Sequence, residues 1–285
     1  MLRAAIITAA LLIVGPARAD GPPAKKAKGP DFLGATLIAV DVPVDLNAAA
    51  VTYRLIGRKP INDIPADGRQ EAVRKDDRTV EVVVRPAEQP ADGGGKLPVK
   101  APEGMESCLT PTLWLESGSP EIRELTAKAL DGETGALAAA RKLEAFVHGW
   151  ITDKNLKTAF GTAKQTAKTR AGDCTEHAVL LAAMGRAAGI PTRVAAGLVY
   201  ADQFVGRKQL FAYHMWTEMY IAGAWRPFDA ALHGRGGYGV GHIALATSDM
   251  SAFNSDARLG VGLINMVGNL RIEVVEQKPA GGGGR

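Results

Sequence analysis

The chain is poor in cysteine, with only Cys108 and Cys174 among its 285 residues. Two cysteines are too few for the disulfide framework of a small secreted domain, and a chain of this length does not need such a staple. A disulfide between the two is the alternative, and it would exclude a catalytic role for Cys174. We therefore predict that both thiols are free.

A strong charge of one sign is also lacking, since 34 basic and 30 acidic residues leave a formal net charge of +4. This surplus is too small to indicate a nucleic-acid partner. No phosphate-binding loop, dinucleotide fingerprint or metal-ligand spacing stands out, and the glycines at 234–241 lack the strand-before, helix-after setting of a phosphate loop. We therefore expect no cofactor and no bound metal.

Long apolar runs are missing except for Ala4–Gly15, which is too short to span a bilayer comfortably. Arg3 precedes this run and the A-x-A motif ending at Ala19 follows it, as in a secretory signal peptide. We predict cleavage after Ala19 and a periplasmic or secreted protein without stable membrane insertion. Loss of Arg3 and Arg18, with no acidic residue, would lower the formal charge from +4 to +2. An uncleaved membrane anchor is the alternative.

The remaining composition, 46% hydrophobic and 22% charged, suits one large globular domain or two small ones. Three β-branched segments with turn residues between them (ATLIAV, AVTYRLI and TVEVVVR) indicate a small β-rich region. A Gly- and Pro-rich stretch at 88–104 is typical of a linker. The predicted organisation is a signal peptide at 1–19, a flexible lead-in at 20–30, a β-rich region and linker at 31–100, the main domain at 101–276, and a disordered tail at 277–285.

After the linker, apolar residues at helical spacing predict helices over about 119–130 and 135–151. His148 lies on the second helix, and we interpret it as a helix-surface or core histidine because no partner is visible nearby. The basic segment 154–170 is interpreted as a solvated face that carries the chain over the surface.

The next helix is predicted to begin at Cys174. Asp173 is a suitable N-cap and Glu176 completes a capping-box pattern, so Glu176 is interpreted as a cap rather than an acid catalyst. The following residues are apolar on most of the helix circumference, and Gly189-Ile190-Pro191 is a stop signal. The positive end of the helix dipole would lower the pKa of the thiol and favour the nucleophilic thiolate. A small buried cysteine without chemistry is the alternative. For His177, one turn on, we favour a structural role.

Beyond Pro191 the apolar pattern changes to period two, which predicts strands at about 194–200, 211–221 and 225–230. A tight turn at Ala222-Gly223 would pair the last two strands as a hairpin. With a two- or four-residue loop, His214 and Asp229 become diagonal neighbours on one face, within hydrogen-bond reach. Trp216 on the same face is either a shield for His214 or a core residue.

A thiol at a helix start, a histidine on a strand and an aspartate on the paired strand supply the roles of a cysteine-nucleophile triad. In that scheme Cys174 attacks a carbonyl carbon, His214 moves the proton, and Asp229 fixes the imidazole tautomer. The Cys174 backbone N–H would donate to the oxyanion. His242 follows a glycine-rich loop that could close over this site.

The segments GDCTEHAVLLAAMGRAAGIPTRVAAGLVY and YHMWTEMYIAGAWRPFDAAL resemble the core of the bacterial transglutaminase-like superfamily, a branch of the papain-like cysteine hydrolases and acyltransferases. The resemblance covers about 113–245 and implies Cys174 as nucleophile, His214 as general base and Asp229 as orienting acid. It also implies an α+β fold in which the nucleophile helix packs on an antiparallel sheet. The first strands, with YRL, resemble the smaller amino-terminal region of some exported members more weakly.

We therefore predict an exported thiol enzyme that acts on amide bonds of peptides, proteins or cell-wall peptides, with a peptidase or amidase favoured over a transglutaminase. A non-catalytic binding or assembly module on the same fold is the main alternative. A metal hydrolase built from Cys174, His177 and His214 is a weaker one, because no ligand spacing or supporting second shell accompanies these residues.

Overall fold

The structure is a computed structural model that describes residues 36–88, 90–91, 93–155, 160–234, 237–251 and 266–280. The predicted signal peptide, its cleavage site and the lead-in at 20–30 lie outside the described residues, as do the last five residues of the predicted tail.

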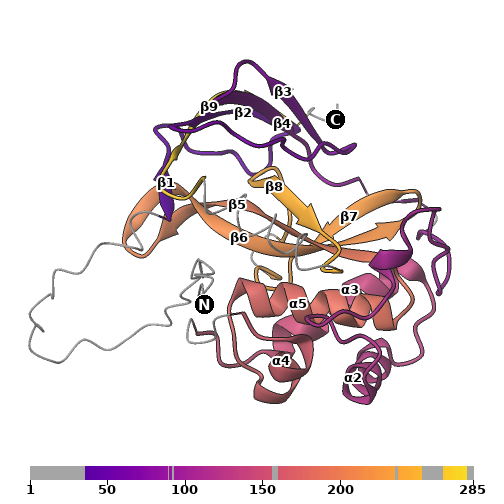
Figure 1. Ribbon diagram of the computed structural model, residues 1–285. Coiled ribbons are helices and arrows are strands. Elements are labelled where there is room, and N and C mark those ends of the chain that lie inside the picture. Colours follow the sequence, from indigo (N-terminus) through magenta and orange to yellow (C-terminus); the bar gives the residue numbers. More distant parts are fainter. Residues whose placement is uncertain are drawn as a thin grey trace, which may run out of the picture.

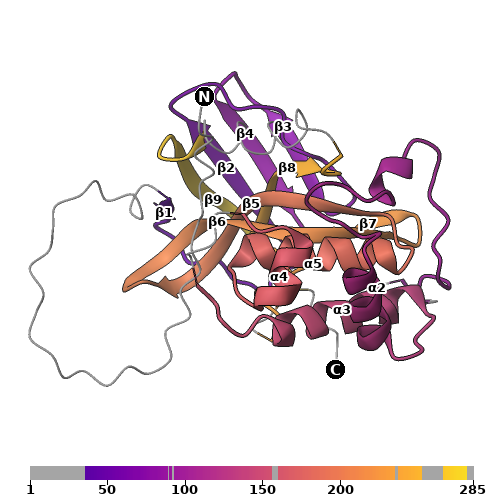
Figure 2. The ribbon, with the colours of Figure 1, turned by 60° about the horizontal axis from the view of Figure 1, so that its bottom comes forward.

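Two antiparallel sheets and a group of helices form three layers (Figure 1). The larger sheet has the order β1-β6-β5-β8, with β7 also paired to β6, and the smaller sheet has the order β3-β4-β2-β9. Helices cover one face of the larger sheet and the smaller sheet covers the other, which Figure 2 shows from a second side. The strands are β1 (Leu37–Ala39), β2 (Ala50–Gly57), β3 (Gln70–Arg74), β4 (Thr79–Val84), β5 (Thr192–Phe204), β6 (Arg207–Ile221), β7 (Ala224–Phe228), β8 (His242–Ser248) and β9 (Leu270–Lys278).

The helices are α2 (Pro120–Leu130), α3 (Ala136–Trp150), α4 (Ala163–Thr169) and α5 (Cys174–Ala187), with a short 3-10 turn at Glu106–Cys108. The predicted helices over 119–130 and 135–151 are confirmed as α2 and α3. α2 begins because the Ser119 side chain accepts from the Ile122 N–H. α4 was not predicted: it lies inside the basic segment, where only Ala163 and Thr166 of its residues are buried. Two buried positions are too few to produce a visible helical period.

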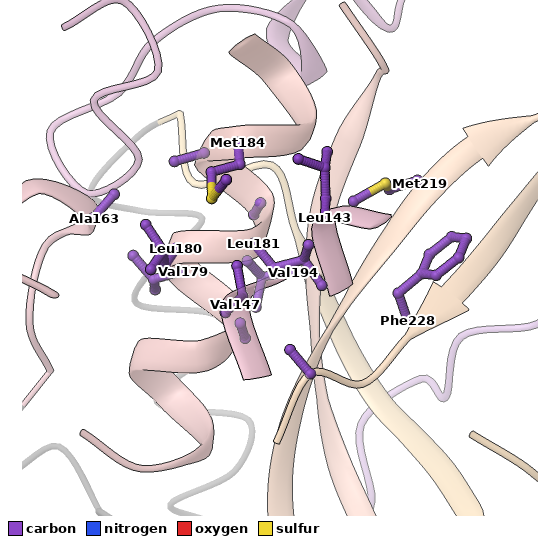
Figure 3. Packing of buried hydrophobic residues seen from close by; sticks show 14 of the residues in the cluster. Leu143, Val147, Ala163, Val179, Leu180, Leu181, Met184, Val194, Met219 and Phe228 are labelled. Carbon is purple, nitrogen blue, oxygen red and sulfur yellow. The ribbon is translucent and has the colours of Figure 1, made fainter. Parts of the chain in front are cut away.

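The main core forms around α5, which is buried on nearly all sides (Figure 3). Val179, Leu180 and Met184 pack with residues of α3, among them Leu143 and Val147. This is the arrangement expected for a helix that is apolar on most of its circumference. The predicted α+β fold, in which the helix that begins at Cys174 packs on an antiparallel sheet, is confirmed.

The smaller sheet is joined to the larger one by a second core. Tyr53 of β2 is fully buried, and its ring lies edge-on to Phe211 of β6 with centroids 5.4 Å apart. Its hydroxyl donates to the Val240 carbonyl at 2.9 Å. β9 pairs with β2, and β1 pairs with β6. The division of the chain near residue 100 stays a prediction about sequence regions. β1 precedes this point but belongs to the larger sheet, and β9 follows it but belongs to the smaller sheet.

The hairpin of β6 and β7 has the predicted register. Thr217 pairs with Phe228 and Ile221 pairs with Ala224, so the loop is Ala222-Gly223. Both loop residues have positive φ, 52° and 77°, as a tight two-residue turn requires. This register places the side chains of His214 and Asp229 within hydrogen-bond distance of each other.

We expect Gly197, at the centre of β5, to tolerate no side chain. A Cβ there would lie 2.0 Å from the Ile243 carbonyl oxygen and 2.9 Å from the Trp216 ring. Overpacking of this kind costs about 1–3 kcal/mol or more, so Gly197→Ala should lower the unfolding free energy by at least that amount in a denaturant titration. The control is Gly149→Ala near the end of α3, where a Cβ meets nothing within 4 Å. Alanine there should raise stability by about 0.5–1 kcal/mol. Equal effects of the two substitutions would contradict this packing.

Candidate active site

The first turn of α5 places Cys174. The Asp173 side chain accepts from the Thr175 N–H at 2.8 Å, and the Glu176 side chain accepts from the Asp173 N–H at 2.9 Å. The Asp173 side chain also accepts from the Glu176 N–H, which together with the Glu176 bond completes the predicted capping box, and Cys174 is the first residue of the helix. Glu176 also accepts from the Gly161 N–H at 2.7 Å, so its carboxylate ties the helix start to the preceding loop.

The sulfur of Cys174 lies beside β6. β1 pairs with β6 over residues 210–212 and β7 pairs with it over 217–221, which leaves residues 213–216 between them on this edge. The Met215 N–H, in this interval, donates to the Cys174 sulfur. The sulfur of the candidate nucleophile therefore accepts a hydrogen bond from the residue that follows His214.

His214 is bonded to Asp229 in a buried pair. Its Nε2 lies 2.7 Å from Asp229 Oδ2, and both side chains are at most 1% exposed. His214 Nδ1 is buried and has no hydrogen-bond partner. Because an ionised carboxylate only accepts, the proton of the neutral imidazole lies on Nε2, and Nδ1 is left with its lone pair. The arrangement suits His214 Nδ1 as a base.

The geometry agrees with a known family. A family model described as the transglutaminase-like superfamily matches residues 123–230, a segment that contains all three candidate residues. The chain is therefore similar to this superfamily over these residues. No curated protein matches the chain in sequence.

Solved structures similar to the chain include a candidate cysteine protease from Cytophaga hutchinsonii, with 18% identity, a TM-score of 0.49, and coverage of 70% of this chain and 79% of that one. The periplasmic domain of TgpA from Pseudomonas aeruginosa has 18% identity, a TM-score of 0.45, and coverage of 70% and 76%. Red sea bream transglutaminase has 13% identity, a TM-score of 0.34, and coverage of 65% and 46%.

The electrostatics around Cys174 differ from the sequence-based expectation for the thiol. Burial raises the pKa of Cys174 well above its ordinary value, and the carboxylates of Asp173, Asp229 and Glu176 raise it further. The Met215 N–H opposes this shift without reversing it. The prediction of a thiolate with a lowered pKa was therefore wrong for this state: desolvation outweighs the helix dipole, and the resting thiol is neutral.

Asp229 remains ionised in spite of its burial. Burial alone would raise its pKa, but the attraction to His214 when that ring is protonated, with hydrogen bonds from His214 and His242, lowers the pKa overall. Oδ1 accepts from the Ala231 and Leu232 N–H groups at 3.0 and 3.1 Å. A carboxylate with this many donors stays charged while a proton moves on His214.

Neighbouring polar residues have structural contacts. His177 Nδ1 donates to the Asp173 carbonyl at 2.6 Å, and burial lowers the pKa of His177 to about 4, so its ring is neutral. His148 Nδ1 donates to the Ala230 carbonyl at 2.8 Å, a partner that sequence spacing did not reveal. Trp216 is almost fully buried and its ring lies roughly parallel to His214, with centroids 6.2 Å apart and a 27° interplanar angle. Trp216 is thus a core residue that also packs against the His214 ring.

In the part of the chain that the structure describes, no helix has the length and apolar character needed to cross a bilayer. The ligand atoms of His214, Asp229 and His242 lie within 4.8 Å of one another. This set differs from the one considered from the sequence, since it lacks Cys174 and His177. Cys108 and Cys174 are not joined by a disulfide, as predicted.

We expect the substitution Asp173→Asn to lower the pKa of the Cys174 thiol. Asp173 is the largest cause of the raised thiol pKa after burial, and its own pKa is raised to about 7 by burial and by Glu176. Asparagine keeps an N-cap oxygen and removes the charge. The pH dependence of Cys174 alkylation by iodoacetamide, followed by peptide mass spectrometry, should move to lower pH. Glu121→Gln in the first turn of α2 is the control, and an unchanged profile for Asp173→Asn would contradict the assignment.

Proposed function

We propose that this chain is an exported thiol-dependent enzyme that acts on amide bonds of peptides, proteins or cell-wall peptides through a Cys174–His214–Asp229 triad. One observation carries the proposal. The Cys174 sulfur is bonded to the Met215 N–H, next to His214, whose Nε2 is fixed on Asp229 and whose Nδ1 has no partner. A structural cysteine would not need a histidine held in this tautomer.

The neutral resting thiol defines the first step. As the sulfur attacks the carbonyl carbon, His214 Nδ1 removes the thiol proton and becomes an imidazolium, which the charge of Asp229 stabilises. The C–N bond then breaks and the imidazolium returns the proton to the leaving amine. The positive end of α5 stabilises the negative charge on the carbonyl oxygen during attack. The product is a thioester between the acyl group and Cys174.

Water or an amine then resolves the thioester. Hydrolysis is our first candidate, because water needs no binding site of its own. Burial of Cys174 and His214, which are 2% and 3% exposed, favours transamidation as the second, since shielding from water preserves an acyl-enzyme for an amine. A substrate must displace the side chains that cover the thiol in either case.

A burst assay tests the proposal. p-Nitrophenyl acetate should release one equivalent of p-nitrophenol rapidly and leave an acetyl group on Cys174, detected by mass spectrometry. Adding a primary amine separates the two outcomes: a faster second phase with an amide product indicates transfer, and an unchanged phase indicates hydrolysis. No burst and no acetylated Cys174 would contradict the enzyme.

The binding or assembly module is tested with Cys174→Ala. If the variant keeps the biological activity of the exported protein, the fold serves binding and not catalysis. Export itself rests on the N-terminal sequence, and Edman sequencing of secreted material should begin at Asp20. A retained Met1 would contradict cleavage after Ala19.

A further inference from the structure

His242 is a second histidine bonded to the carboxylate that orients His214. It begins β8, outside the segment matched by the family model, and its Nε2 lies 3.0 Å from Asp229 Oδ2. This is the same oxygen that accepts from His214 Nε2 at 2.7 Å. One carboxylate oxygen thus lies between two imidazoles that come from different strands.

The hydrogen bonds of His242 define its tautomer. Its Nδ1 accepts from the Gly239 N–H at 3.4 Å, so Nδ1 carries a lone pair and the proton must lie on Nε2. His242 is therefore a neutral donor to Asp229. Burial lowers its pKa, opposed by the hydrogen bond and charge of Asp229, and His214 and Arg69 lower it further. These three charged or titratable groups come from the residues after β7, from β6 and from the residue before β3.

Aromatic and cationic side chains hold this ring in place. Tyr238 stacks on His242 with centroids 4.3 Å apart and an interplanar angle of 29°, and Trp216 meets it edge-on at 5.5 Å. The Arg69 guanidinium lies over the Tyr238 ring, 4.8 Å from its centroid, and Arg69 is only 6% exposed. Arg69 belongs to the predicted β-rich region. That region therefore contributes, through Tyr238, to the packing around His242, which donates to Asp229.

Two donors on Oδ2 and two on Oδ1 use the full accepting capacity of the Asp229 carboxylate. Without His242, Oδ2 would have one donor, and its position would depend on the bond to His214 alone. We propose that His242 is a positioning residue of the triad, whose neutral Nε2–H holds Asp229 Oδ2 in line with His214. The inference rests on the proposed function of Cys174, His214 and Asp229.

A matched pair of variants tests the role. The amide of His242→Gln extends to about the position of the imidazole Nε2 and can donate to Asp229, whereas that of His242→Asn is one methylene shorter and cannot reach it. Asparagine should reduce the rate of Cys174 acetylation by p-nitrophenyl acetate about 10- to 100-fold, with glutamine within about threefold of the unmodified chain, as for other supporting hydrogen bonds.

The pH profile distinguishes positioning from a merely structural role. Removing one donor leaves Asp229 more negative toward His214, so the acid limb of the acetylation rate should move to higher pH in His242→Asn and stay in place in His242→Gln. Equal losses with unshifted limbs in both variants would overturn the proposal. Thermal unfolding of each variant shows whether it is folded.

Nitrogen-15 NMR of the unmodified chain needs no variant and decides the tautomer directly. His242 should be neutral with its proton on Nε2 near pH 7, and an imidazolium or an Nδ1–H tautomer would overturn the proposal. Metal analysis tests the alternative that His214, Asp229 and His242 bind a metal ion. Stoichiometric zinc whose removal changes these NMR signals would make His242 a metal ligand and overturn the proposal. If the unmodified chain shows no burst, the proposed function fails; if the burst depends on Cys174 but not on His242, only this inference fails.

Discussion

Replacing Asp229 with asparagine is expected to reduce the acylation rate of Cys174 by about 10⁴-fold, the scale seen when a triad acid loses its charge. The carboxylate accepts four hydrogen bonds, from His214, His242 and the Ala231 and Leu232 N–H groups. An asparagine has one oxygen, so in either orientation its NH₂ group faces donors. If the NH₂ faces His214, the imidazole must place its proton on Nδ1, and the base is lost.

The same substitution should also lower the free energy of unfolding. Each buried donor left without an acceptor costs about 1–3 kcal/mol, and at least one loses its acceptor in either orientation. A denaturant titration measures this loss, and rates must be compared at temperatures where the variant is folded. Glu144→Gln is the control, because Glu144 accepts from the backbone N–H of Asp229, at 2.7 Å, and from His233 at 3.5 Å, and glutamine keeps a side-chain oxygen that can accept. An Asp229→Asn variant with more than a tenth of the acylation rate would contradict the triad.

Replacing Cys174 with serine should abolish acylation, with a loss of about 10⁴-fold or more. Serine keeps an acceptor for the Met215 N–H, so the fold should be little affected. The hydroxyl is a much weaker nucleophile than the sulfur, in a site built around a thiol. Cys108→Ser is the matched control: Cys108 is also buried with a raised pKa, but its electrostatic neighbours include Arg186 and Asp249 and not the triad. Equal losses from the two substitutions would contradict the assignment of Cys174.

Features that depend on residues close together in the sequence could be predicted from the sequence alone. The capping box depends on residues three apart, and the register of the β6–β7 hairpin depends on a two-residue turn, so both were predictable. The pairing of β9 with β2 joins segments more than 200 residues apart, so neither a turn motif nor a hydrophobic periodicity in the sequence could predict it. The predicted strands at 194–200 and 211–221 are also longer in the structure: β5 extends to Phe204 and β6 begins at Arg207, with a tight turn containing Gly206 between them.

The meeting of His214 with Asp229 was predictable for the same reason, since one hairpin carries both. The ionisation of Cys174 was not, because its pKa depends on burial and on three carboxylates that the fold gathers around it. His242 was named only for the glycine-rich loop before it. Its contact with Asp229 depends on the pairing of β8 with β5, which local spacing does not encode.

The most direct test of the central claim is quantitative mass spectrometry of Cys174 acetylation by p-nitrophenyl acetate, comparing the unmodified chain with His214→Ala near pH 7. If His214 Nδ1 removes the thiol proton during attack, acetylation occurs selectively at Cys174 over Cys108 and falls by at least about 100-fold in the variant. Acetylation of Cys174 at the same rate in both proteins, or none in the unmodified chain, would contradict the claim.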